Sequence, residues 1–194
     1  LEHARGFLTR VLFATGLAVL FLAVAGILAG IEMGRQPNAI IIIVAAILGG
    51  YMALNIGAND VANNVAPAVG CRAMSLVTAL VIAAIFESAG ALLAGGDVVR
   101  TISKGIIDPA LVADPKVFVW AMMAALLSSA LWVNLATYVG APVSTTHSVV
   151  GGVAGAGIAA VGFSAVNWAT MSAIAASWVV SPFLGGIVAA LFLA

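Results

Sequence analysis

The chain has 194 residues, of which 64% are hydrophobic and only 7% are charged. Soluble globular domains carry about a quarter charged residues, so a water-soluble fold is excluded and the apolar residues are expected to face membrane lipid. Seven basic residues balance seven acidic ones, which argues against a nucleic-acid partner because such a partner requires a basic face.

Apolar segments along the chain predict the membrane topology. A spanning helix needs about 20 mainly apolar residues, and four segments meet this length. Two further apolar runs are too short or are interrupted. The pattern predicts an all-α membrane protein with about four to five transmembrane helices plus one or two broken or half helices. The long segments are Phe7–Gly30, Met74–Ala94, Val117–Val139 and Trp168–Leu193, and the short runs are Ala39–Asn55 and Ser144–Val161.

The first polar segment, Asn59–Asn64, follows an apolar run that is too short to span. Asp60 and the neighbouring amides are therefore expected at membrane depth, where a carboxylate costs about 2.5–3.5 kcal/mol or more. Gly57 permits non-helical backbone and Pro67 interrupts a helix, so we expect an unwound stretch. Carboxylate and amide oxygens on such a stretch are typical of a Na⁺ site. The alternative is a polar loop at the interface, capped by Asn59 and Asp60.

Two features follow before the second polar segment. Glu87 lies in the middle of a predicted helix and is expected to face the protein interior or a wet cavity. Its role is either ion coupling or a structural hydrogen bond, and we favour the structural role. The polar stretch Gly95–Lys116 is predicted to form a short helix or a loop at the membrane interface.

The second polar segment is Pro142–Ser148. Proline followed by Ser and Thr indicates a helix start, and free N–H groups with the positive dipole end make helix starts favourable for anions. Three consecutive hydroxyls, on Ser144, Thr145 and Thr146, add neutral donors. The alternative is an ordinary helix cap. His147 is expected to donate a hydrogen bond rather than to titrate, and its spacing from Ser144 does not indicate a nucleophile with an oriented base, so no enzyme is predicted.

Both segments resemble signatures of one family. Gly57–Asn63 is similar to the GANDVAN signature of the inorganic phosphate transporter (PiT) family, and Pro142–His147 is similar to its PVSTTH segment. The order and separation of the two segments, and the position of Glu87 after the first, also fit that family. The resemblance covers most of the chain from about Ala39 onwards.

This resemblance implies a cation-coupled (Na⁺ or H⁺) inorganic phosphate symporter that works by alternating access in the cell membrane, with several spanning helices. No cofactor is implied beyond the coupling ion. Family members contain two inverted repeats, and this chain has one copy of each signature. It therefore resembles one repeat, residues 38–194, preceded by an extra transmembrane helix and loop at residues 1–37. The second repeat is expected from a longer chain or from a second subunit, with a homodimer as the expected assembly.

The resemblance also implies roles for individual residues. A Na⁺ site is expected at Asp60, and phosphate is expected at the helix start of the second segment. Three further residues are carried over to outer positions of the site. The expected cation ligands are Asn59, Asp60 and Asn63, the expected phosphate ligands are Ser144, Thr145 and Thr146, and the outer positions are Asn64, Glu87 and His147.

Three other functions are weighed for the same residues, and one of them is an anion channel, whose flux would not need a cation gradient. Hydroxyl and N–H donors bind any tetrahedral oxyanion, so sulfate is an alternative substrate. A non-transporting membrane subunit is an alternative of a different class, in which Asp60 and Thr145 would be replaceable.

Overall fold

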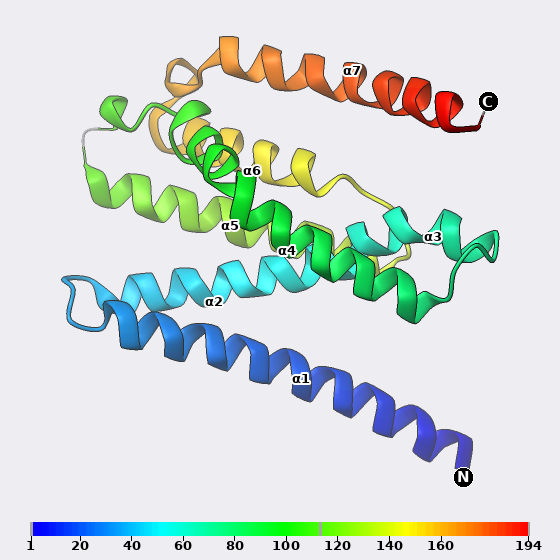
Figure 1. The fold of residues 1–194 in the computed structure, drawn as a ribbon. Coiled ribbons are helices and arrows are strands. Elements are labelled where there is room, and N and C mark those ends of the chain that lie inside the picture. Colours follow the sequence, from blue (N-terminus) through cyan, green and yellow to red (C-terminus); the bar gives the residue numbers. More distant parts are fainter. Residues whose placement is uncertain (1, 113, 194) are drawn as a thin grey trace. The chain divides into compact units, whose positions relative to one another are not determined.

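A computed structural model describes residues 2–112 and 114–193, with side chains from residue 11 onwards. The chain divides into two compact units, Leu1–Phe86 with Met123–Gly152 and Glu87–Met122 with Val153–Ala194, and each is described by itself. Apart from one isolated bridge between Ile107 and Val166, the regular elements of the described ranges are all helical (Figure 1). The α-helices are α1 (Glu2–Met33), α2 (Ala39–Ile56), α3 (Ala62–Gly70), α4 (Leu76–Arg100), α5 (Pro115–Tyr138), α6 (Thr145–Val161) and α7 (Trp168–Leu193).

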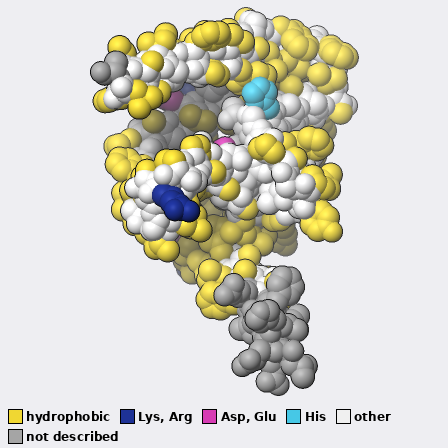
Figure 2. All heavy atoms as spheres, turned by 90° about the vertical axis from the view of Figure 1, so that its right-hand side faces the viewer, with side chains coloured by type: hydrophobic (Ala, Val, Ile, Leu, Met, Phe, Trp, Pro, Cys, Tyr) yellow, Lys and Arg dark blue, Asp and Glu magenta, His cyan; other side chains and the backbone are white. Residues whose placement is uncertain are grey.

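Five helical spans within the described ranges are long and apolar enough to cross a membrane. They are α1 from Val11, the combined segment Ala39–Gly70, the segment Leu76–Gly105, α5 and α7, whereas α6 is shorter. Hydrophobic side chains are spread over the visible surface, and charged side chains are few (Figure 2). The predicted all-α fold of a multi-pass membrane protein is confirmed.

Four helices begin at a polar side chain that accepts a hydrogen bond from a backbone N–H of the first turn. These N–H groups have no partner within their own helix, and Ser, Asp and Asn are the residues best suited to cap them. The caps explain why these helices begin where they do. The capping side chains are Ser75 for α4, Asp114 for α5, Ser144 for α6 and Asn167 for α7.

α7 has the bounds predicted from the sequence, Trp168–Leu193, but two other predictions were wrong in detail. α4 continues to Arg100 and is followed by a π-helical turn at Thr101–Gly105, so the first half of the expected interfacial stretch extends that helix. The expected unwound stretch after Asn55 is instead a π-helical turn, Gly57–Val61, between α2 and α3. Pro67 lies inside α3 and does not end it. Proline is tolerated inside membrane helices because neighbouring groups can satisfy the backbone carbonyl that loses its N–H partner.

The first unit pairs α1 with α2 and packs α2 against α5 and α6. At the α1–α2 contact, a Cβ on Gly26 would lie 3.0 Å from Ile47, and such small residues let membrane helices approach closely. A buried cluster of Met52, Ala130 and Val133 joins α2 to α5. Partly buried side chains from the α6 region complete this cluster, so the core lies directly beside both polar segments. These side chains include Val143 and Val149.

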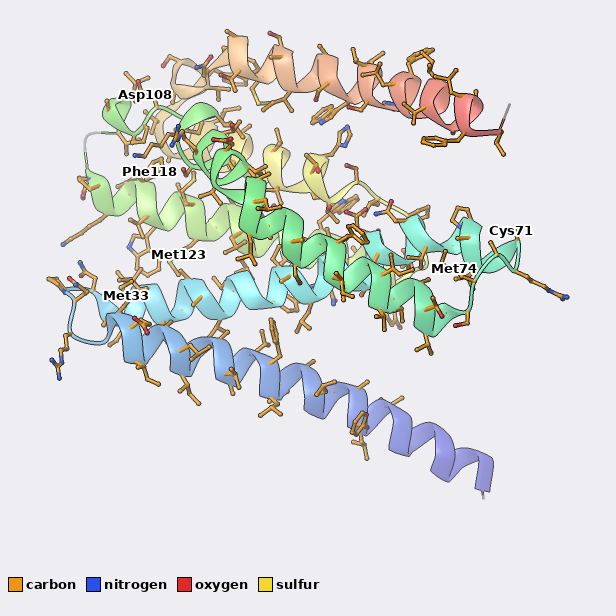
Figure 3. All side chains as sticks on the ribbon, in the orientation of Figure 1. Met33, Cys71, Met74, Asp108, Phe118 and Met123 are labelled. Carbon is orange, nitrogen blue, oxygen red and sulfur yellow. The ribbon has the colours of Figure 1, made fainter. Side chains whose placement is uncertain are left out.

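The second unit is held by the connection that follows α4. Ile106 and Ile107 are its most buried side chains, and Ile107 lies against Gly157 of α6. The backbone N–H of Asn167 donates to the carbonyl of Ile106 at 2.8 Å. The labels in Figure 3 locate Asp108 in this connection and Cys71 at the turn between α3 and α4 of the other unit.

Close packing of α5 on α6 yields a stability prediction. A Cβ on Gly152 would lie 2.9 Å from the carbonyl oxygen of Ala125 and would collide with the hydroxyl of Ser129. We expect Gly152→Ala to destabilise the fold by about 1–3 kcal/mol, which lowers the thermal midpoint by roughly 2–4 °C per kcal/mol. Gly151→Ala is the matched control, because nothing lies within 4 Å of its Cβ position. Equal midpoints for the two variants, measured by circular dichroism in detergent, would contradict this packing.

Candidate functional site

The π-helical turn presents Asp60 as a half-buried carboxylate inside an apolar span. In a π-helical turn the hydrogen bonds run from residue i to i+5, and such turns occur frequently at functional sites. Among the described residues, only the hydroxyl of Thr145 hydrogen-bonds the Asp60 carboxylate, and no Lys or Arg side chain forms an ion pair with it. The carboxylate therefore keeps most of its capacity to accept a cation or further donors.

The start of α6 joins the two polar segments. Thr145, the first residue of α6, is buried and donates from Oγ1 to Oδ2 of Asp60 at 2.9 Å. Ser144 caps the helix, since its Oγ accepts from the backbone N–H of His147 at 3.2 Å. A hydrogen bond between side chains that lie 85 residues apart in the chain thus brings the two polar segments together.

The side chain of Asn59 forms four hydrogen bonds, and the residue is 6% exposed. Its Nδ2 donates to Oγ1 of Thr137 at 3.1 Å and to the carbonyl of Ala141 at 3.2 Å. Its Oδ1 accepts from Nδ2 of Asn63 and from the backbone N–H of Val143, both at 3.3 Å. Three of these hydrogen bonds connect the π-helical turn to the end of α5 and to the segment between α5 and α6, and the bond from Asn63 is a local contact with α3.

A second pair lies one turn away on the same helices. Nδ2 of Asn134 in α5 donates to Oδ1 of Asn55 in α2 at 2.9 Å, and Asn55 in turn donates to the carbonyl of Tyr51 at 2.9 Å. Further along α5, Oγ of Ser129 lies 2.9 Å from the carbonyl of Ser148 in α6. Polar side chains that bond between helices stabilise membrane bundles, so α5 fixes both polar segments.

The remaining predicted residues are placed more loosely. Thr146, Asn63 and Asn64 are exposed, and of these only Asn63 hydrogen-bonds a side chain, that of Asn59. His147 is exposed and its backbone N–H belongs to the helix cap. Glu87 is exposed on α4 at the start of the second unit. The ligand roles of all these residues stay predictions. The predicted division of the chain into residues 1–37 and 38–194 also stays a prediction, and its first residue, Leu1, lies outside the described residues.

A cleft of about 380 Å³ opens between the π-helical turn and the end of α5. Its polar lining comes from Asn59, Asn63 and Thr137, and its other lining residues are small or Pro. The cleft gives a ligand access to Asn63, whereas the amide of Asn59 at its wall is already hydrogen-bonded to the protein.

Sequence reasoning missed Asn55, Asn134 and Thr137. One signal was available, because Asn55, Asn59 and Asn63 recur every four residues, and residues four apart are neighbours on a helix. That spacing places Asn55 on the same side as the first polar segment. Nothing in the sequence pairs Asn134 or Thr137 with particular residues of another helix.

Comparisons with known proteins relate the chain to one family. The phosphate transporter family matches residues 56–194 of the chain. Proteins named "Putative phosphate permease" are similar to it: that of Helicobacter pylori strain J99 is 52% identical over 99% of the chain, and that of Pyrococcus abyssi is 46% identical over 76%. The chain spans 36% of the length of each of these relatives.

A solved structure with the name "The sodium-dependent phosphate transporter" is also similar. It superimposes with a TM-score of 0.71 and 48% sequence identity, over 76% of this chain and 36% of that chain.

The cap at Ser144 can be separated from any role in binding an anion. We expect Ser144→Ala to lose about 1 kcal/mol of stability, because the N–H of His147 loses its acceptor. Ser144→Asp keeps a capping oxygen and should keep the thermal midpoint, although it adds a negative charge beside the predicted phosphate site. If Ser144→Asp proved as unstable as Ser144→Ala, the cap would not be the source of this stability.

Proposed function

Because the chain belongs to the phosphate transporter family, we propose that it provides one half of the substrate site of a Na⁺-coupled inorganic phosphate symporter. The observation that carries the proposal is the hydrogen bond of 2.9 Å between Thr145 and Asp60, which joins the predicted cation segment to the predicted anion segment. Na⁺ is chosen over H⁺ because a similar solved structure is named as sodium-dependent. A transporter family also supports a function other than catalysis.

Asp60 is proposed to bind the cation. Hard cations take oxygen ligands, and the carboxylate of Asp60 has one hydroxyl partner among the described side chains, so its second oxygen remains open to an ion. The side-chain oxygen of Asn63, at the cleft, is the proposed neighbouring ligand. Asn64 and Glu87 keep the outer roles predicted for them.

Phosphate is proposed to bind at the start of α6. The first turn of this helix has N–H groups and a positive dipole end that favour an anion, and the exposed hydroxyl of Thr146 adds a donor. Ser144 uses its oxygen as an acceptor in the cap, which leaves its proton for a phosphate oxygen. Neutral donors suit an anion that must be released after transport.

The coupling is proposed to run through the hydroxyl of Thr145. Without a cation, its proton points to Asp60 and is not available to phosphate. The negative charge of Asp60 also repels phosphate, by about 4 kcal/mol for unit charges 4 Å apart at an effective dielectric constant of 20. A cation on Asp60 removes this repulsion and displaces the hydroxyl proton, which can then turn to a phosphate oxygen. Each ion therefore favours binding of the other.

Transport requires that the loaded site change its access from one side of the membrane to the other. In transporters with inverted repeats, one repeat rocks against the other around a fixed site. The second repeat is proposed to come from a longer chain or a second subunit, in keeping with the 36% of relatives' length that this chain spans. The assembly is proposed to be a homodimer, with lipid around the exposed apolar helices.

The first test is uptake of labelled phosphate into liposomes, with and without an inward Na⁺ or H⁺ gradient. We expect Na⁺-driven uptake that excess sulfate does not inhibit, either by this chain or by the chain extended to the length of its relatives. Asp60→Asn should remove the Na⁺ dependence, because it removes the charge that binds the cation. If the Asp60→Asn protein retains that dependence, the cation role of Asp60 is wrong.

Replacing Thr145 tests the coupling step. Thr145→Val keeps the shape and removes the hydroxyl, so Na⁺ should no longer strengthen phosphate binding to the same degree, whereas Thr145→Ser should preserve the effect. The measurement is the half-saturating phosphate concentration for uptake at low and high Na⁺. A Thr145→Val protein with the full wild-type dependence on Na⁺ would contradict the coupling role.

The same assays separate the alternative functions. Inhibition by sulfate that equals inhibition by unlabelled phosphate would indicate a general oxyanion transporter. Phosphate uptake that ignores every cation gradient would indicate a channel. If this chain is a non-transporting subunit, an assembly that contains it should keep full phosphate uptake when the chain carries both Asp60→Asn and Thr145→Val.

A further inference from the structure

We propose that Asn59 is a positioning residue and that its side chain does not bind the cation. In this inference, the amide of Asn59 fixes the π-helical turn to the end of α5 and to the segment before α6, so that Asp60 stays beside Thr145. The three hydrogen bonds of this amide to Thr137, Ala141 and Val143 are called the Asn59 bridge. The inference rests on the proposed cation role of Asp60 and replaces the predicted ligand role of Asn59.

Hydrogen-bond capacity is the first argument. An asparagine amide has two N–H donors and one oxygen with two lone pairs. Both donors are used, on Oγ1 of Thr137 and the carbonyl of Ala141, and both lone pairs are used, on the amide of Asn63 and the N–H of Val143. A cation could bind Oδ1 only by breaking one of these bonds at a position that is 6% exposed.

The orientation of the amide is set by its backbone partners. The carbonyl of Ala141 can only accept, so the nitrogen of Asn59 must face it. The N–H of Val143 can only donate, so the oxygen of Asn59 must face that side. These two fixed partners exclude the flipped amide, which would place two donors together and two acceptors together. The hydrogen-bond pattern is therefore determined without reference to the side chains of Thr137 and Asn63.

The bonds of Asn59 bracket the hydrogen bond that carries the coupling. Asn59 precedes Asp60 directly, and Val143 lies two residues before Thr145. One amide thus constrains the backbone on both sides of the Thr145–Asp60 contact. Val143 is also packed against the buried cluster of Met52, Ala130 and Val133, so the Asn59 bridge connects the candidate site to the core of its unit.

Asp60 shows the opposite pattern. It is half-buried, and in the described part of the chain its carboxylate has a single hydrogen-bond partner, the hydroxyl of Thr145. Adjacent residues of one motif are therefore suited to different tasks. Asn59 is saturated by the protein and holds the backbone, whereas Asp60 has capacity left for an ion.

Thr137 gives a test that does not touch any proposed ligand. Its hydroxyl donates to the carbonyl of Val133 at 2.8 Å and accepts from Asn59, so Thr137→Val removes one bond of the bridge and preserves the shape. Thr137→Ser keeps the hydroxyl and serves as the conservative variant. Ser128→Ala, which removes a hydroxyl elsewhere on α5 that bonds only within that helix, is the control for loss of a hydroxyl as such.

The experiment is a double-mutant cycle of Asn59→Ala and Thr137→Val, made in whichever chain length gives phosphate uptake. The readouts are the half-saturating Na⁺ concentration, the maximal rate and the thermal midpoint. We expect Thr137→Val to raise the half-saturating Na⁺ concentration by roughly two- to tenfold, and the double variant to match Asn59→Ala alone, because residues in one network are not additive. Thr137→Ser and Ser128→Ala should resemble the wild type.

Two results would overturn the inference. One is a normal half-saturating Na⁺ concentration for Thr137→Val while Asn59→Ala raises it, as expected if Asn59 binds the ion directly. The other is full multiplication of the two effects in the double variant. Failure of the proposed function is recognised separately, because the Asp60→Asn protein would then retain its Na⁺ dependence. In that case the thermal midpoints of the double-mutant cycle still decide whether Asn59 and Thr137 are coupled.

Discussion

A carboxylate inside an apolar helical span is the constraint on which this structure depends. Asp60 lies in the span Ala39–Gly70, where an unsatisfied polar group costs several kcal/mol. The chain meets this cost with one hydroxyl from Thr145 and leaves the rest of the carboxylate open. In the proposed mechanism a cation stabilises this carboxylate further, and the hydroxyl of Thr145 links the cation to the helix start at which an anion is favoured. The proposed coupling between the two ions depends on this shared hydrogen bond and on the charge of Asp60.

The surrounding polar side chains keep that hydrogen bond in place. Asn59 connects the π-helical turn to α5, the Asn55–Asn134 pair connects α2 to α5, and the buried cluster around Val133 packs beside them. The phosphate transporter family to which the chain belongs is matched from residue 56 onwards, a range that includes both segments. The candidate site is therefore joined by hydrogen bonds and packing to the core of one unit.

Hydropathy predicted the helices well because membrane length and the loss of water act on every residue of a span. The bounds of α7 are an example, and the start of α6 followed from its capping serine. The π-helical turn at Gly57–Val61 could not be predicted, because glycine permits several backbone forms and does not select one. The sequence also could not assign different roles to Asn59 and Asp60, since both are adjacent polar residues of one motif. Their difference comes from Thr137 and Val143, which lie about 80 residues away along the chain.

Equilibrium binding of labelled phosphate to the purified protein at a series of Na⁺ concentrations tests the central claim most directly. Coupling between two ligands is reciprocal, so Na⁺ should tighten phosphate binding by the same factor by which phosphate tightens Na⁺ binding. The account predicts that this factor is large in the wild type and smaller in Thr145→Val, in which only the effect of the Asp60 charge remains. A phosphate affinity that does not change with Na⁺ in the wild type, measured at constant ionic strength, would contradict it.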